Sequence, residues 1–142
     1  MVLFSKDRIL VPIDFSEKSV QALKETIAFA GDISAVHVVH VLKPLDSVQP
    51  GVVWDTVDDS KREETIQALF NETFPGDEYS GLSFSIEKGE PTAEIIDYAE
   101  RQKISLIVMP SRGRTGISRF FMGSIAERVI RFAHCPVLVL RQ

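Results

Sequence analysis

The residues best suited to chemistry lie in one segment near the C-terminus, residues 110–124, which reads PSRGRTGISRFFMGS. Gly113 and Gly116 permit backbone turns that a Cβ atom would obstruct. Gly123 and Ser124 stand where a helix should begin, and the N–H groups and positive dipole end of a helix N-terminus attract anions. The spacing therefore predicts a seat for a phosphate group.

Two arginines flank the first of these glycines. Arg112 and Arg114 can supply guanidinium donors at the rim of an anion site, and phosphate oxygens accept such hydrogen bonds well. The alternative is that Gly123 and Ser124 only cap a helix and that the arginines belong to a solvated loop. Glycine-rich turns before helices are common, so the spacing alone leaves both interpretations open.

The charge of the chain is unevenly distributed. Residues 110–142 carry six arginines and one acidic residue, a net charge of +5, whereas the whole chain has a formal net charge of −4 and the remainder therefore −9. Nucleic-acid binding favours a basic footprint over a whole contact face. A short basic segment in an acidic protein favours a small anion instead, and we expect no nucleic-acid partner.

Other side chains that could do chemistry show no catalytic or metal-binding pattern. His37, His40 and His134 lie in or beside apolar strands, which is typical of structural histidines. Asp14 has no partner carboxylate at a recognisable spacing, so we expect it to hydrogen-bond a ligand rather than to act as an acid or base. We expect neither a catalytic residue nor a metal site.

Cys135 is the only cysteine and lies in the apolar run HCPVLVL, so it cannot form an intramolecular disulfide. This setting predicts a small buried hydrophobe rather than a reactive thiol, which needs an exposed electropositive environment. No apolar run approaches the eighteen or so residues of a membrane span, and the N-terminus lacks a signal-peptide pattern. We expect a cytoplasmic protein that does not associate with a membrane.

Strand and helix patterns alternate along the chain. Short apolar runs predict strands over residues 9–13, 35–42, 82–86, 106–109 and 136–140, the third of them at an edge of the sheet. Helical periodicity predicts helices between Ser16 and Gly31 and over residues 60–74, 91–102 and 123–132. This order predicts an α/β fold with a five-stranded parallel sheet and helices on both faces. The 142 residues suit a single domain over residues 1–142.

The second helix has an apparent capping box, with Ser60 followed three residues later by Glu63. Residues 43–59 before it contain two prolines and Trp54, and they predict a long loop. Long ordered loops are often functional lids, but a surface excursion with Trp54 packed on the body fits the sequence equally well.

The topology determines where a ligand should bind. In open parallel sheets ligands lie beyond the carboxyl ends of the strands, near the point where strand order reverses. Asp14 ends the first strand, Val41 lies at the end of the second, and residues 110–124 leave the fourth. These three segments are therefore expected to meet at one edge of the sheet.

The sequence resembles the universal stress protein family over nearly its whole length, from Arg8 to Arg141. The likeness rests on four segments, ILVPIDFSEKSVQAL, HVLKP, KGEPTAEIIDYAE and the closing IVMPSRGRTGISRFFMGSIAERVIRFAHCPVLVLR. The resemblance implies a Rossmann-like fold of the adenine nucleotide alpha hydrolase type. It also implies that the chain binds ATP or AMP.

Members of this family that bind ATP carry a glycine, two residues, a second glycine, nine residues, and then a glycine followed by serine or threonine. Gly113, Gly123 and Ser124 fit this motif, but Pro110 stands at the place of the first glycine. Proline fixes φ and has no N–H, so affinity suffers if that glycine normally donates its amide.

The resemblance assigns roles to individual residues. Pro12 and Asp14 would flank the adenosine, and backbone groups of Val41 would contact adenine. The phosphates would be held by Gly113, Arg114, Gly123, Ser124 and Ile125, with Mg²⁺ beside them. Arg112 at the rim and Met109 at the end of the fourth strand complete the candidate set.

The family likeness further implies a homodimer in which the last strand, residues 137–140, pairs with its symmetry mate. An apolar edge strand of this kind is a hazard unless it is paired or covered.

Three functions follow from these observations. The first is a regulatory or stress-response module that responds to nucleotide occupancy. The second is an interaction scaffold of the same fold that has lost nucleotide binding, as Pro110 suggests. The third is a weak ATPase, for which the sequence offers no general base or phosphoacceptor near the glycine-rich segment.

Overall fold

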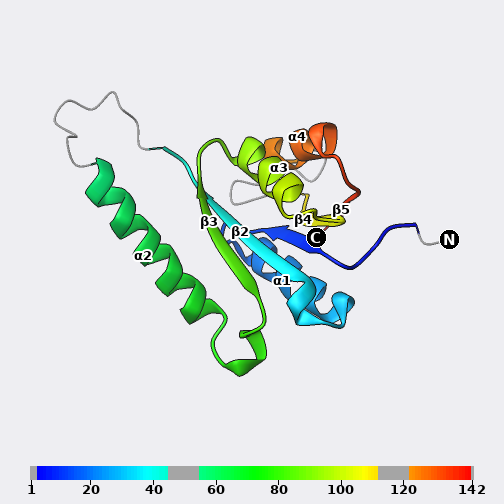
Figure 1. Cartoon of the computed structure of the whole chain (residues 1–142), viewed down its shortest axis with the longest axis horizontal. Helices are drawn as coiled ribbons and strands as arrows, with labels where there is room; N and C mark the ends of the chain where they lie inside the picture. Colours follow the sequence, from blue (N-terminus) through cyan, green and yellow to red (C-terminus); the bar gives the residue numbers. More distant parts are fainter. Residues whose placement is uncertain (1–2, 45–54, 112–121, 142) are drawn as a thin grey trace.

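The computed structural model describes residues 3–44, 55–111 and 122–141. Strands and helices alternate along the chain, and short 3₁₀ turns lie at Ile33–Ala35 and Asp77–Tyr79. In order, the elements are β1 (Ile9–Pro12), α1 (Glu17–Ala30), β2 (Val36–Leu42), α2 (Asp55–Thr73), β3 (Ser83–Lys88), α3 (Pro91–Arg101), β4 (Leu106–Pro110), α4 (Ser124–Phe132) and β5 (Val137–Leu140) (Figure 1).

The strands form one parallel sheet in the order β3-β2-β1-β4-β5. β1 is central, with Ile9 in register with Val36 of β2 and with Leu106 of β4. Such strands are buried on both faces, which explains why β1 and β4 read as continuous apolar runs. The predicted α/β class and the edge position of β3 are confirmed.

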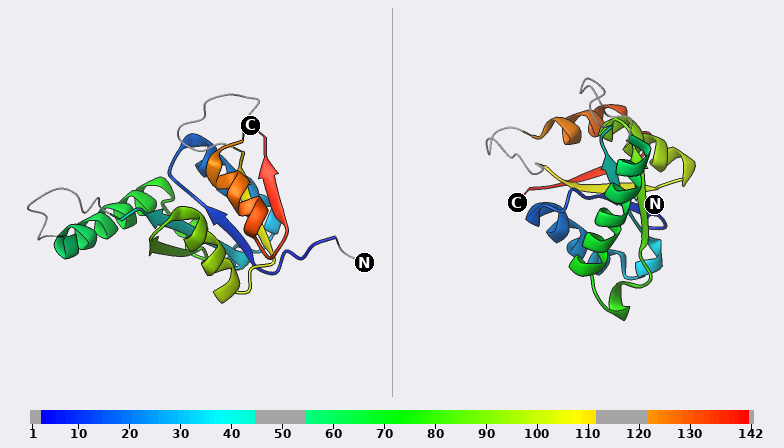
Figure 2. Two further views of the ribbon diagram at one scale, coloured as in Figure 1. Left: turned by 90° about the horizontal axis from the view of Figure 1, so that it is seen from above. Right: turned by 90° about the vertical axis from the view of Figure 1, so that its left-hand side faces the viewer.

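Two apolar cores lie on opposite faces of this sheet. One joins alternate sheet residues to α1 and α2 through Leu23, Phe70 and Phe74. The other joins the remaining sheet residues to α3 and α4, with Tyr98 and Val129 buried in it. The right-hand view of Figure 2 shows the helices on both sides of the sheet, as the sequence predicted.

The first helix begins and ends where its sequence signals stand. The side chain of Ser16 accepts a hydrogen bond from the backbone N–H of Ser19, which satisfies one of the N–H groups left free at a helix start. Gly31 ends α1 with a φ of 78°, a conformation that glycine adopts without a Cβ penalty.

The second helix is longer than the sequence predicted. It begins at Asp55, so residues 55–59 are helical rather than part of a loop, and Ser60 lies inside the helix instead of capping it. Asp59 pairs with Arg62 one turn later at 3.2 Å, an interaction that helical spacing provides. The rest of the predicted loop, residues 45–54 with Trp54, lies outside the described residues.

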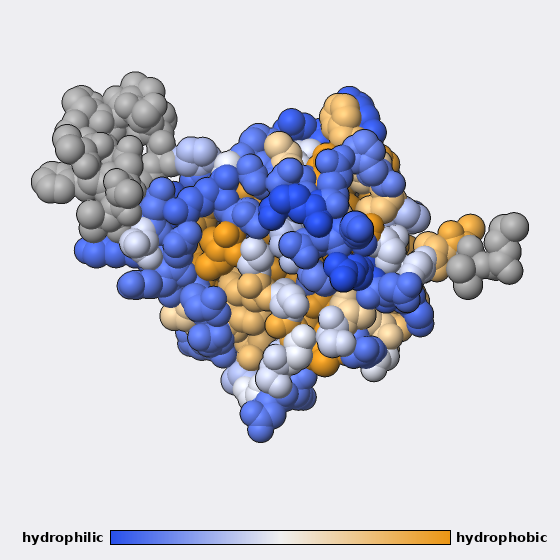
Figure 3. All heavy atoms as spheres, in the orientation of Figure 1, coloured by the Kyte–Doolittle hydropathy of each residue, from blue (hydrophilic) through white to orange (hydrophobic). Residues whose placement is uncertain are grey.

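The C-terminal part of α2 holds this helix to the sheet. Phe70 stacks on Phe84 of β3 with ring centroids 4.0 Å apart, and the buried Phe74 ring contacts Phe70 with centroids 5.1 Å apart. Leu69, directly before Phe70 in the sequence, is 37% exposed. Figure 3, in the orientation of Figure 1, shows apolar atoms at the middle of the visible face of the molecule, with hydrophilic residues around them.

Within the described part of the chain, no helix is both long and apolar enough to cross a membrane.

Candidate functional site

The order of strands reverses between β1 and β4. From β1 the chain moves outward through β2 to β3, then crosses back to β4 on the other side of β1 and ends at β5. α1 follows β1 on one face of the sheet, and α4 follows β4 on the other. The N-termini of both helices therefore lie at the carboxyl edge, on the two sides of the switch point where parallel sheets bind ligands (Figure 2).

The turn between β1 and α1 forms one side of this edge. Pro12 ends β1, and Asp14 lies two residues later, half-buried. Asp14 Oδ1 accepts a hydrogen bond from the N–H of Ser16 at 3.0 Å, while the Asp14 N–H donates to Ser19 Oγ at 3.3 Å. The carboxylate of Asp14 thus stabilises the turn in which it lies.

The start of α4 forms the other side of the edge. Gly123 is the N-cap residue and provides no side-chain cap. The first backbone N–H groups of the helix, at Ser124 and Ile125, have no partner within it by helix geometry. Both residues are exposed, and the positive end of the helix dipole lies at this point of the edge.

Gly123 itself has φ −65° and ψ 154°, an extended conformation that any residue can adopt. The absence of a side chain at this position is therefore not required by the backbone. A glycine here adds no side chain over the N–H groups of α4, which favours close approach of an anion.

Pro110, which replaces a glycine of the family motif, is the last residue of β4 and is buried. It lies in register with Leu140 of β5, and the next N–H, from Ser111, donates to the Leu140 carbonyl at 2.9 Å. The carbonyl of Ser111 then accepts from the N–H of Gly123 at 2.7 Å. The sheet therefore tolerates proline at this position, and Ser111 ties the end of β4 to the start of α4.

The remaining candidates divide into two groups. Val41 is the penultimate residue of β2 and is half-buried at the carboxyl edge, whereas Met109 is 6% exposed and packs in the core beneath α3 and α4. Arg112, Gly113 and Arg114 lie outside the described residues. The described strands and helices thus bring Pro12, Asp14, Val41, Gly123, Ser124 and Ile125 to one edge of the sheet.

Two residues at this edge were not predicted from the sequence as part of the site. His40 of β2 forms a hydrogen bond through Nδ1 with the carbonyl oxygen of Ile13 at 2.8 Å. Phe15 contacts the His40 ring, with centroids 5.2 Å apart, and has a φ of 62°. The position of His40 immediately before Val41 was the available signal. The left-handed backbone of Phe15 has no sequence signal, because phenylalanine is not a residue that favours it.

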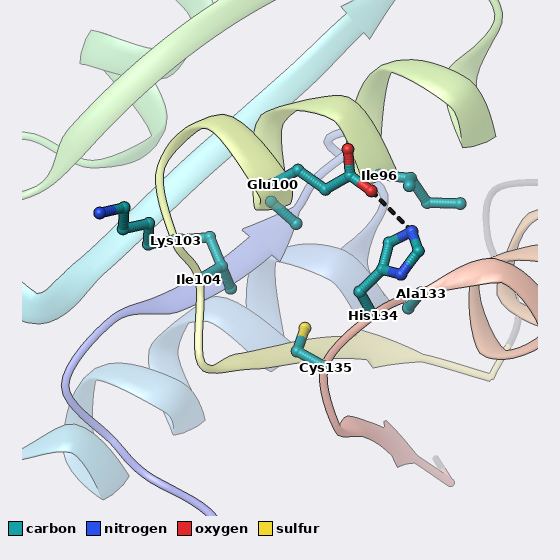
Figure 4. Close-up of a pocket in the computed structure, with 8 residues that line it drawn as sticks. Ile96, Glu100, Lys103, Ile104, Ala133, His134 and Cys135 are labelled. Atoms are coloured by element: carbon teal, nitrogen blue, oxygen red, sulfur yellow. Dashed lines mark ion pairs between the residues drawn. The ribbon is translucent and has the colours of Figure 1, made fainter.

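A cavity of about 160 Å³ lies elsewhere, beside the end of α3 and the residues that precede β4 and β5. Cys135 and Ile104 line its apolar part, and an ion pair between His134 Nε2 and Glu100 Oε1, 2.6 Å apart, lies at its rim (Figure 4). Cys135 is half-buried, and burial raises the pKa of its thiol. Since this cavity is at the amino ends of β4 and β5, it is separate from the candidate binding residues at the carboxyl edge of the sheet.

Comparison with known proteins gives consistent matches over almost the whole chain. The model of the universal stress protein family matches residues 6–141. Universal stress protein MJ0531 of Methanocaldococcus jannaschii is 36% identical over 141 residues, which cover 95% of this chain and 82% of that protein. The solved structure of MJ0577 from the same organism has a TM-score of 0.80 at 28% identity and covers 96% of both chains. A universal stress protein solved in complex with cAMP has the same fold at 18% identity, with a TM-score of 0.57 over 95% of this chain and 96% of that one.

Proposed function

This chain belongs to the universal stress protein family, and we propose that it binds an adenine nucleotide, ATP or AMP, at the carboxyl edge of β1, β2 and β4. The observation that carries the proposal is the start of α4. There Gly123 places no side chain over the first N–H groups of the helix, at the switch point of a parallel sheet. Nucleotide occupancy would act as a regulatory signal in a stress response.

The phosphates would lie against the N-terminus of α4. The N–H groups of Ser124 and Ile125 are suitable donors, and the Ser124 hydroxyl adds a third. By family resemblance Arg112, Gly113 and Arg114 would complete this half of the site, with Mg²⁺ neutralising part of the phosphate charge.

The adenosine would lie across the ends of β1 and β2. Pro12 and Asp14 would flank it, and the backbone of Val41 would offer hydrogen bonds to adenine. The side chain of Met109 is buried, so Met109 would support the site from below rather than contact the ligand through its side chain. The universal stress protein solved with cAMP supports the idea that this fold can hold an adenine nucleotide.

A homodimer through β5 is the second part of the proposal. β5 is an edge strand with Leu138 38% exposed, and the neighbouring α4 exposes Ile130 and Phe132 by 43% and 53%. Pairing of two β5 strands would cover apolar surface and satisfy the unpaired edge. Replacing Leu138 with lysine should then shift the mass in light scattering from dimer to monomer, whereas an unchanged mass would argue against this interface.

Thermal denaturation with ATP or AMP, with and without Mg²⁺, tests nucleotide binding, because a ligand that binds only the native state raises the melting temperature. Gly123→Val should abolish the rise by covering the N–H groups of α4, while its extended backbone accepts valine. Ala133→Val is the matched control, since Ala133 has φ −67° and ψ 147° at the opposite end of the same helix.

A wild-type protein whose melting temperature ignores millimolar ATP and AMP would contradict the nucleotide proposal. That result would favour the alternative function, a dimeric interaction scaffold that does not bind nucleotide. Pro110 is the residue that supports this alternative, because it lacks the N–H that a glycine would offer there.

A further inference from the structure

The turn that carries Asp14 contains a residue in an unfavourable conformation. Phe15 has a φ of 62°, in the left-handed region that bulky side chains avoid. Such a conformation costs free energy and persists only where surrounding contacts over-determine it, and these residues cluster at ligand sites. Contacts around Phe15 must therefore stabilise this conformation.

Several of these contacts are local to the turn. The Ser16 N–H donates to Asp14 Oδ1, the Asp14 N–H donates to Ser19 Oγ, and the Ser19 hydroxyl donates to the Ser16 carbonyl. All of these residues belong to the turn or to the first turn of α1. They shape the turn, but they do not fix its position relative to the sheet.

Two hydrogen bonds tie the turn to β2 of the sheet. The Ile13 N–H donates to the Val39 carbonyl at 2.9 Å, which extends the strand pairing one residue past the end of β1. The Ile13 carbonyl is bonded to His40 Nδ1 at 2.8 Å. Neighbouring residues of β2 thus hold both backbone polar groups of Ile13, directly before Asp14.

The chemistry of the His40 bond determines its tautomer. A carbonyl oxygen can only accept a hydrogen bond, so the hydrogen must be on Nδ1 of His40. The ring of His40 also packs against the Phe15 ring at 5.2 Å and 57°. One side chain of β2 therefore contacts the turn on both sides of Asp14, through the carbonyl before it and the ring after it.

We propose that His40 is a positioning residue of the nucleotide site, which fixes the turn from Ile13 to Ser16 against β2 so that Asp14 is held ready for the nucleoside. This inference rests on the proposed function. Because His40 acts on the β1 side of the switch point, it affects binding of the nucleoside part of a ligand and leaves phosphate binding at α4 unchanged.

Two substitutions separate the hydrogen bond from the ring. His40→Leu removes the donor and keeps an apolar side chain, whereas His40→Asn places an amide N–H donor near the position of Nδ1. Calorimetric titration with AMP, ATP and inorganic tripolyphosphate should show about ten-fold weaker AMP and ATP binding for His40→Leu, as expected for one lost hydrogen bond. Affinity for tripolyphosphate should not change, and His40→Asn should recover most of the nucleotide affinity.

A second measurement does not depend on any ligand. Nitrogen NMR of the free protein should find the hydrogen of neutral His40 on Nδ1, and amide exchange at Asp14 and Ser16 should accelerate in His40→Leu but not in His40→Asn. Exchange that is equal in all three proteins, or a hydrogen on Nε2, would overturn the role of His40.

The two proposals fail in different ways. If the wild type binds neither AMP nor ATP, the proposed function fails, while the exchange experiment still decides whether His40 holds the turn. If the wild type binds both nucleotides and His40→Leu binds them equally well, the site stands and the positioning role of His40 is wrong. Equal weakening of AMP, ATP and tripolyphosphate would also overturn it, because it would indicate a general loss of structure.

Discussion

The carboxylate of Glu90 joins two helices by bonding to Arg128. Its Oε2 accepts a hydrogen bond from the Ala93 N–H at 2.8 Å and caps α3, and its Oε1 accepts from the Arg128 guanidinium of α4, also at 2.8 Å. α4 begins at the proposed phosphate site, so Glu90 connects the start of α3 to the helix that would bind the ligand.

We expect Glu90→Ala to lower the free energy of unfolding by about 1 kcal/mol, chiefly through loss of the helix cap. The exposed ion pair with Arg128 adds little by itself, because water screens it. Glu90→Gln keeps an oxygen that can accept from Ala93 and should therefore lose less stability than Glu90→Ala. Urea denaturation measures both variants, and equal losses would show that charge, not capping, is the contribution of Glu90.

The stability that Glu90 contributes should be lost at low pH. The hydrogen bond from the Ala93 N–H, with a smaller contribution from Arg128, holds the pKa of Glu90 below its usual value. A lowered pKa gives stability that is present above the unfolded pKa, near 4.3, and is lost as the pH falls through the folded value. Wild type should therefore lose more stability than Glu90→Gln between pH 5 and pH 3 (roughly the range in which Glu titrates).

His37 of β2 should make the stability of the protein depend on pH in a higher range than Glu90 does. Its Nδ1 lies 2.9 Å from the Tyr98 hydroxyl oxygen, and burial, with a smaller effect of Arg8, lowers the pKa of His37. The unfolded chain then binds a proton near pH 6.5, before the folded chain does, so stability falls as the pH drops below that value.

Melting temperatures between pH 8 and pH 5 (roughly the range that spans His titration) should therefore decrease less for His37→Asn than for the wild type. Tyr98→Phe is the control. It removes the hydroxyl and should lower the free energy of unfolding by about 1 kcal/mol at every pH. Burial and Arg8 still lower the pKa of His37 in this variant, so the melting temperature should keep its dependence on pH. A slope that persists in His37→Asn would assign the effect to another group.

Thr92, in the first turn of α3, is 2% exposed, and its hydroxyl oxygen has no hydrogen-bond partner in the described structure. A buried polar group without a partner costs about 1–3 kcal/mol, and valine has nearly the same shape. Thr92→Val should thus raise the free energy of unfolding by about 1 kcal/mol in urea denaturation. Thr92→Ser, which keeps the hydroxyl and loses the methyl group, should lower it; a strong loss in Thr92→Val would reveal an unseen partner.

The strands and three of the helices could be predicted because local signals and the global fold agree. The apolar runs of β1 and β4 can be buried only in the centre of a parallel sheet, and Ser16 and Gly31 mark the ends of α1. The predicted start of α2 was wrong. Ser60 and Glu63 match a capping box, but both lie within a helix that begins at Asp55.

The candidate site was predictable where it depends on topology and not where it depends on individual contacts. The carboxyl edge follows from strand order, which brings Asp14 and Ser124 to the switch point. The hydrogen bond of His40 with Ile13 joins residues 27 positions apart. The conformation of Phe15 opposes its own preference, so no local pattern could indicate either feature.

The thiol of Cys135 should be alkylated slowly in the native protein. Burial raises the pKa of its thiol, so the reactive thiolate is scarcer at pH 8 than in an exposed cysteine, and the apolar walls of its cavity limit access. Iodoacetamide should therefore modify the native protein at least about ten-fold more slowly than the same protein in urea, as mass spectrometry can follow. His134→Ala, which removes the ion pair with Glu100 at the cavity rim, should speed native modification without changing the rate in urea. Equal rates in native and unfolded protein would instead mean that the cavity leaves the thiol open to solvent, and that Cys135 is available for modification.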